Sequence, residues 1–121
     1  MKHNFQIDRD KNIITETFEG EVTLADLNEA NQNILNHPDF IIGLNFLTDF
    51  RSARLHMDYD KMSQYVCFHT ELDKNKVAII ADKDNEFGLA RMYEMLSEQE
   101  SLWKEFKVFR NKEEAEKWLT L

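Results

Sequence analysis

The sequence predicts a single α/β domain with a mostly parallel sheet and the element order ββαβαβαβα. Three short segments, 41–47, 76–81 and 106–109, are apolar nearly throughout instead of alternating, which is typical of strands covered on both faces. Stretches with helical spacing of apolar residues separate these segments. Strands joined through helices of this length run parallel, with right-handed crossovers. The 121 residues fit one domain, 1–121.

The N-terminal residues predict an antiparallel hairpin at the edge of this sheet. Residues 5–8 and 12–18 form short strand-like runs joined by a polar Arg-Asp-Lys turn. In the second run Ile14, Glu16 and Phe18 share one side of the strand, because side chains alternate between the two faces. We expect Gly20 to end this strand.

Each predicted helix has a start signal. Thr23 and Asp26 form a capping-box pair before a stripe of apolar residues, and that helix is expected to end at His37, before Pro38. A second helix should run from Asp58 or Asp60 to about residue 72. The others are expected at 84–99 and from Asn111 onward.

The composition excludes several classes of partner. Fifteen basic against 23 acidic residues give a net charge of −8, which disfavours nucleic acid and anionic membranes. The single cysteine, Cys67, permits no internal disulfide. No apolar run is long enough for a membrane span or a secretion signal, so we expect a cytoplasmic protein without integral membrane association.

Several segments together carry a family resemblance. They are Glu-Gly-Glu-Val-Thr at 19–23, His-Pro-Asp-Phe at 37–40, Asn-Phe-Leu-Thr-Asp at 45–49, Phe-Gly-Leu-Ala-Arg-Met-Tyr-Glu at 87–94 and Val-Phe-Arg at 108–110. With these the chain resembles STAS-like domains, the fold of anti-sigma-factor antagonists. It is most similar to a bacterial branch related to lipid-binding CRAL-TRIO domains. The resemblance implies a (β-α)n superhelix that acts by binding rather than catalysis.

One feature of the anti-sigma-factor antagonists is not matched. Their phosphorylatable serine lies in an Asp-Ser-Ser/Thr-Gly type turn, whereas Ser52 has neither a tandem hydroxyl nor a following glycine. The phosphorylation switch is therefore not carried over to this chain.

The carboxyl ends of the parallel strands are the expected place for a ligand, as in other open α/β sheets. There we expect a long loop over 49–60 holding Asp49, Arg51, Ser52 and Arg54, with Asp82 in the next connection. Two arginines beside a helix start could hold a carboxylate or a phosphate. Alternatively, they pair with neighbouring acids as a surface network.

The predicted helix at 84–99 has more apolar residues than packing on a sheet requires. Phe87, Met92 and the adjoining Arg91 are candidates for a second contact, either with a twin subunit or with a small apolar or acidic ligand. A deeply buried helix would explain the same pattern. A closed, dry pocket lined by Phe87, Met92 and Phe50 would favour the ligand.

No motif for catalysis, metal binding or nucleotide binding is present. The acidic run at 82–86 lacks the spacing and the glycine of a calcium loop, and helix capping explains it. An acid–base enzyme would require Asp49 and His56 within hydrogen-bond reach. We therefore expect no catalytic residue, metal or cofactor, and a non-enzymatic module that binds a protein, most simply as a homodimer. The alternatives are a carrier or sensor of a small ligand and, third, a small acid–base enzyme.

Overall fold

The computed structural model describes residues 1–67, 76–100 and 105–121. The strands there are β1 (Lys2–Asp8), β2 (Ile13–Val22), β3 (Asn45–Leu55), β4 (Lys76–Ile80) and β5 (Glu105–Phe109). The helices are α1 (Leu24–Leu35), α2 (Tyr59–Cys67), α3 (Asp84–Glu100) and α4 (Lys112–Leu119). The predicted order ββαβαβαβα is confirmed.

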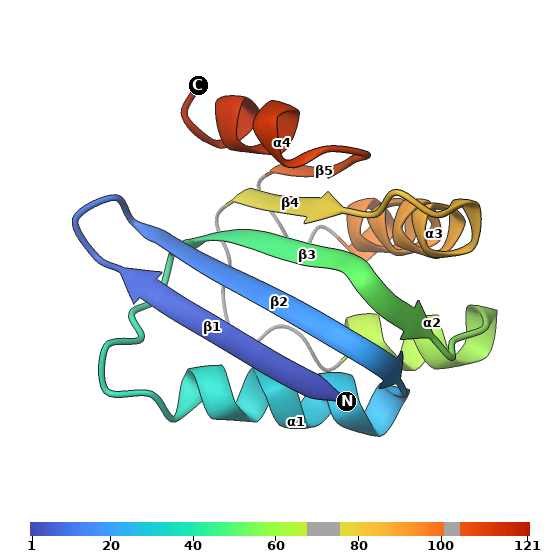
Figure 1. The fold of residues 1–121 in the computed structure, drawn as a ribbon. Helices are drawn as coiled ribbons and strands as arrows, with labels where there is room; N and C mark the ends of the chain where they lie inside the picture. Colours follow the sequence, from blue (N-terminus) through green and yellow to red (C-terminus); the bar gives the residue numbers. More distant parts are fainter. Residues whose placement is uncertain (68–75, 101–104) are drawn as a thin grey trace.

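The strands form one mixed sheet in the order β1-β2-β3-β4-β5 (Figure 1). β1 and β2 are antiparallel, with Lys2 opposite Glu19 and Asp8 opposite Ile13, and the other neighbours are parallel. Each crossover moves one strand onward in the same direction. Right-handed connections therefore place α1, α2 and α3 on one face of the sheet, and α4 lies on the opposite face (Figure 1).

Each face of the sheet has its own core. Phe46 and Ile14 are fully buried under α1, α2 and α3, together with Ile34 of α1. The α4 side is smaller and consists of Leu47, Ala78, Ile80, Phe109, Ala115 and Leu119. β4 contributes to both cores, which explains its continuous apolar sequence.

β3 differs from the prediction at both ends. We expected a strand over 41–47 and a loop over 49–60, but the strand runs from Asn45 to Leu55. Its pairing with β4 ends at Asp49, whereas its pairing with β2 continues to Leu55. Beyond Asp49 the buried residues Phe50, Ala53 and Leu55 are separated by polar ones, and this polar stretch was wrongly predicted to be a loop.

A β-bulge accounts for the irregular pattern of β3. Thr17 pairs with Asp49 but Glu19 pairs with Ser52, so β3 contains one extra residue there. The bulge reverses the alternation, and Phe50 and Ala53 consequently face the same core.

The prediction that Gly20 ends β2 was also wrong. The strand continues to Val22, and Gly20 pairs with Ala53 at a φ of +83°. Glycine is suited to this position because the left-handed region is unfavourable for residues with a Cβ. The predicted capping box of Thr23 and Asp26 is confirmed, and α1 ends at Leu35, two residues before the expected His37. The predicted end of α2 near residue 72 lies outside the described residues.

Candidate functional site

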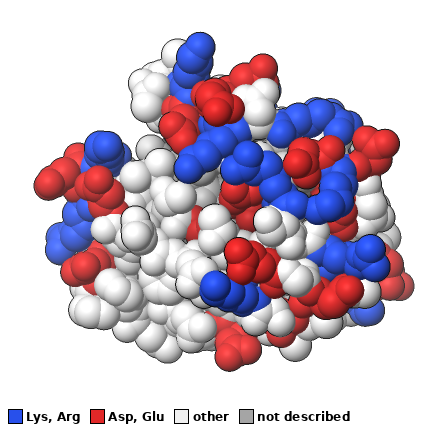
Figure 2. Space-filling view, in the orientation of Figure 1, with Lys and Arg blue, Asp and Glu red and all other residues white. Residues whose placement is uncertain are grey.

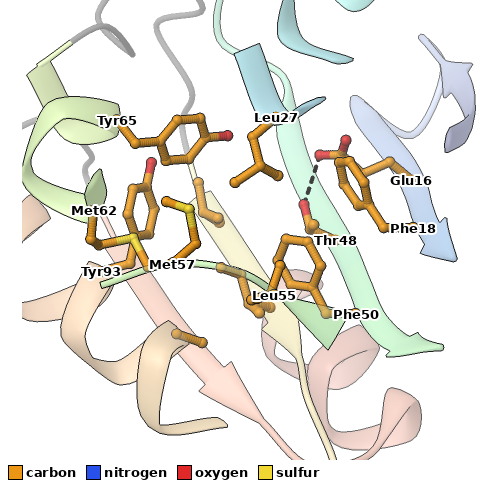
Figure 3. Close-up of a pocket in the computed structure, with 13 residues that line it drawn as sticks. Glu16, Phe18, Leu27, Thr48, Phe50, Leu55, Met57, Met62, Tyr65 and Tyr93 are labelled. Atoms are coloured by element: carbon orange, nitrogen blue, oxygen red, sulfur yellow. Dashed lines mark hydrogen bonds between the residues drawn. The ribbon is translucent and has the colours of Figure 1, made fainter. Parts of the chain in front are cut away.

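A cavity of about 40 Å³ lies between the sheet and helices α1, α2 and α3 (Figure 3). Its walls come from three strands (β2, β3 and β4), three helices and the segment after β3. The lining residues are Glu16, Phe18, Leu27, Thr48, Phe50, Leu55, Met57, Met62, Tyr65, Val77, Ile79, Ala90 and Tyr93. The cavity thus lies within the larger core, where α1, α2 and α3 meet the central strands of the sheet.

Aromatic and sulfur-containing side chains make up much of the wall. The rings of Phe18 and Phe50 stack with centroids 5.0 Å apart, and those of Tyr65 and Tyr93 lie 5.5 Å apart. In Figure 3 the two tyrosines lie with Met62 across the cavity from Glu16 and Phe18. Met57 and Met62 are unbranched and adaptable, so this wall can change shape at low cost.

Three polar side chains form what we call the Glu16 corner: His3, Glu16 and Thr48. Nε2 of His3 donates to Oε1 of Glu16 at 2.9 Å, and the Thr48 hydroxyl donates to Oε2 at 2.8 Å (Figure 3 draws the latter). The side chains of His3 and Glu16 are each only 4% exposed. A buried carboxylate is tolerated here because both oxygens are hydrogen-bonded.

The strand registers bring the Glu16 corner together. Ile14, Glu16 and Phe18 share the face of β2 that the helices cover. Antiparallel pairing sets His3 opposite Phe18, with their rings stacked 4.5 Å apart. Parallel pairing sets Thr48 opposite Glu16. The position of the corner therefore follows from backbone pairing.

Tyr65 and Tyr93 add two hydroxyl groups to the wall. Asn31 of α1 donates its side-chain amide to the Tyr65 hydroxyl at 3.0 Å. Burial raises the pKa of Tyr65 well above its ordinary value, and the charge of Glu16 adds to the increase. The phenol is therefore neutral at physiological pH.

Asp49 and Arg51, both predicted site residues, bind each other on β3. Arg51 donates Nε to Oδ1 at 3.0 Å and Nη2 to Oδ2 at 2.8 Å, and its backbone N–H also reaches Oδ1. Burial alone would raise the pKa of Asp49, but the hydrogen bonds from Arg51 outweigh it, and the pKa lies below its usual value. The same pair raises the pKa of Arg51.

Arg54 and Ser52 lie further along the same strand. Nη1 of Arg54 is 4.0 Å from Glu21, and Ser52 is exposed. His56 also hydrogen-bonds to Glu21, and this contact lowers the pKa of that carboxyl. The two arginines therefore have separate carboxylate partners. Asp49 binds Arg51 while His56 binds Glu21, so these two do not form the pair that an acid–base enzyme would require.

The remaining predicted residues lie on or before α3. The guanidinium of Arg110 is 4.1 Å from the ring centroid of Phe87 and donates to the backbone oxygen of Asp82. Arg91 is exposed and forms an ion pair with Glu94 at 3.3 Å, and Met92 is half-buried against the core. None of these residues lines the cavity, and their role in binding stays a prediction.

The sequence contains one signal for the site, a charged residue on the buried face of β2. Glu16 stands between Ile14 and Phe18 on the face of β2 that the alternation assigns to the core. A charged residue in that phase indicates a buried polar group with partners. The partners themselves depend on strand register, which the sequence alone does not give.

Charged side chains are mixed on the surface. On the face in Figure 2 basic and acidic groups lie side by side along the top and right, and the net charge of −8 is not gathered into one patch there. In the described part of the chain no group of three or more acidic, histidine or cysteine side chains is arranged to hold a metal ion. Over the same residues, no helix is long and apolar enough to cross a membrane.

Comparison with solved structures identifies the fold. The chain is similar to an uncharacterized protein of the DUF3478 family with a SpoIIAA-like fold from Shewanella loihica PV-4, with a TM-score of 0.63 and 17% identity over 98% of this chain and 92% of that one. No family model and no curated protein matches the sequence. The predicted STAS-like fold is confirmed, since the SpoIIAA-like fold is the STAS-like fold.

Proposed function

On the basis of the SpoIIAA-like fold, we propose that this protein is a non-enzymatic binding module that holds a small, largely apolar molecule in the cavity between its sheet and α1, α2 and α3. The observation that carries the proposal is the lining: nine of its residues have hydrocarbon or thioether side chains and two more are tyrosines, set against one buried carboxylate. Ligand pockets typically combine such a wall with a few placed polar groups.

The free-energy cost of an empty cavity favours a bound molecule. An empty void costs about 24 cal/mol per Å³, so 40 Å³ lowers the stability by about 1 kcal/mol. A molecule that fills the cavity recovers that loss through dispersion contacts. Movement of Met57 and Met62 would admit a longer apolar chain than the present volume holds.

The expected pocket and this cavity overlap in one residue. Phe50 lines the cavity, whereas Phe87 and Met92 do not. Phe87 is instead covered by Arg110, and Met92 packs against the core from the side. The proposal therefore keeps the small-ligand alternative from the sequence and moves the ligand toward β2.

A homodimer that pairs through α3 is our second proposal. Its support is Met95, which is 59% exposed on a helix whose other large apolar residues are at least half-buried. Exposed methionine is common at protein-binding surfaces. A cytoplasmic location and a bacterial source complete the proposal, both carried over from the sequence.

Native mass spectrometry of the protein purified from its producing cells separates the two proposals. A monomer carrying a small-molecule adduct is the result expected from the first, and a dimer without an adduct is the result expected from the second. A bare monomer would count against both.

A further inference from the structure

We infer that the ligand carries a hydrogen-bond donor, an alcohol or an amine, on an apolar body, and that Glu16 accepts from that group. This inference rests on the proposed function and names the ligand class for the same cavity. The sequence left open whether the ligand is apolar or acidic, and the Glu16 corner decides between these.

The Glu16 corner offers hydrogen-bond acceptors to a ligand. The carboxylate of Glu16 lines the cavity, and each of its oxygens accepts one hydrogen bond, from His3 on one side and Thr48 on the other. A carboxylate oxygen has two lone pairs, so each oxygen can accept one further donor. Thr48 has already directed its hydroxyl proton toward Glu16, which leaves its oxygen as an acceptor as well.

An acidic ligand is disfavoured by the same geometry. Its carboxylate would lie beside the carboxylate of Glu16 in a site where water screens little, and like charges repel strongly at low dielectric. Along the other walls of the cavity Phe50, Leu55 and Val77 are apolar and buried. Apart from the hydroxyls of Tyr65 and Tyr93, the corner is thus the place where a polar group of the ligand finds acceptors.

Three probes of equal chain length test the inference: propan-1-ol, propylamine and propionate. The protein is labelled with ¹³C at the methionine methyl groups, and chemical shifts are followed during titration by NMR. Met57 and Met62 line the cavity, whereas the exposed Met95 reports non-specific effects in the same spectrum. We expect saturable shifts of Met57 and Met62 with the alcohol, the amine or both, and binding of propionate that is at least tenfold weaker.

The outcomes separate the inference from the function on which it rests. If propionate shifts Met57 and Met62 at the same concentrations as the other probes, the donor class is wrong and the cavity remains a binding site. If no probe shifts them more than Met95, the proposed function fails together with the inference. The three-probe comparison uses the unaltered protein, so no variant has to fold.

A variant tests the role of Glu16 itself. Glu16→Gln keeps the shape of the side chain and replaces the charge with an amide that can also donate. We expect the preference for the alcohol and the amine over propionate to fall at least tenfold in this variant. An unchanged preference, in a variant with an unaltered methionine spectrum before titration, would overturn the assignment of Glu16.

Discussion

Two hydrogen bonds, donated from two different strands, stabilise Glu16 in an apolar interior. His3 approaches from the antiparallel edge strand and Thr48 from the parallel neighbour, so two kinds of pairing meet at one carboxylate. Hydrogen bonds to a charged group contribute more than neutral ones, about 1.5–3 kcal/mol each. The corner therefore stabilises the hairpin edge while it provides a polar wall for the cavity.

Replacing Thr48 by valine measures the value of that arrangement. Thr48→Val keeps the shape and removes a donor from a buried carboxylate, so we expect a loss of about 1.5–3 kcal/mol in the free energy of unfolding by urea titration. Thr15→Val, on the same sheet but facing away from the α1 side, is the control and should change the free energy by less than about 0.5 kcal/mol. Equal effects of the two variants would show that the hydroxyl of Thr48 is not a specific partner.

Asp49 should make the stability depend on pH below its ordinary pKa of 3.8. Its pKa is lowered in the folded state, so its stabilising contribution is fully present above pH 3.8 and is lost as the pH falls through the folded-state pKa. We expect the stability difference between the unaltered protein and Asp49→Asn to be constant from pH 7 to 5 and to shrink below pH 4.

Urea titrations at several pH values give that difference directly. Asp10→Asn, at an exposed position in the hairpin turn, is the matched control. A difference for Asp49→Asn that grows as the pH falls would contradict the assignment of Arg51 as its stabilising partner.

The strands whose buried residues face both cores were predicted most accurately. β4 and β5 were predicted within one residue, because β4 is apolar and buried on both faces and β5 buries Val108 and Phe109 in the two different cores. β3 was misplaced because its second half pairs only with β2, and the bulge near Arg51 interrupts its alternation. No local propensity marks such a bulge, since the partner strand determines it.

The helices were predicted better than the surfaces they present. Thr23 and Asn111 cap their helices as the sequence indicated, because capping depends on residues three positions apart. The apolar surplus of α3 was also real, but Arg110 and the sheet cover most of it. Contacts between distant segments decide this, and one sequence does not give them.

Two buried alanines on different helices distinguish a cavity wall from a filled core. Ala90 of α3 lines the cavity, whereas Ala30 of α1 is 0% exposed and does not line it. Ala90→Val adds two methyl groups to free space, so we expect the free energy of unfolding to change by less than about 1 kcal/mol. Ala30→Val adds the same groups to a packed site and should cost about 1–3 kcal/mol.

Thermal or urea unfolding of the two variants gives the comparison. A loss for Ala90→Val as large as that for Ala30→Val would mean that the space beside Ala90 is too small to accept a methyl group. In that case the cavity could not hold a ligand without a large rearrangement.

The two faces of the sheet are covered differently. One helix, α4, covers the β3–β5 half of one face and makes a small, closed core. Three helices cover the other face, and their junction leaves the cavity with the Glu16 corner at one side (Figure 3). A ligand in that position would contact both the sheet and the three helices that cover it. Binding should therefore stabilise the whole domain by mass action.

The most direct test of ligand binding is a high-resolution crystal structure of the protein as purified from its producing cells, examined at the cavity bounded by Phe50, Tyr65 and Tyr93. We expect continuous electron density for a small molecule there, with a donor group within about 3 Å of a Glu16 oxygen. A cavity that is empty, or filled only by ordered water bonded to Glu16 and Thr48, would contradict the proposal that this protein binds a small apolar molecule.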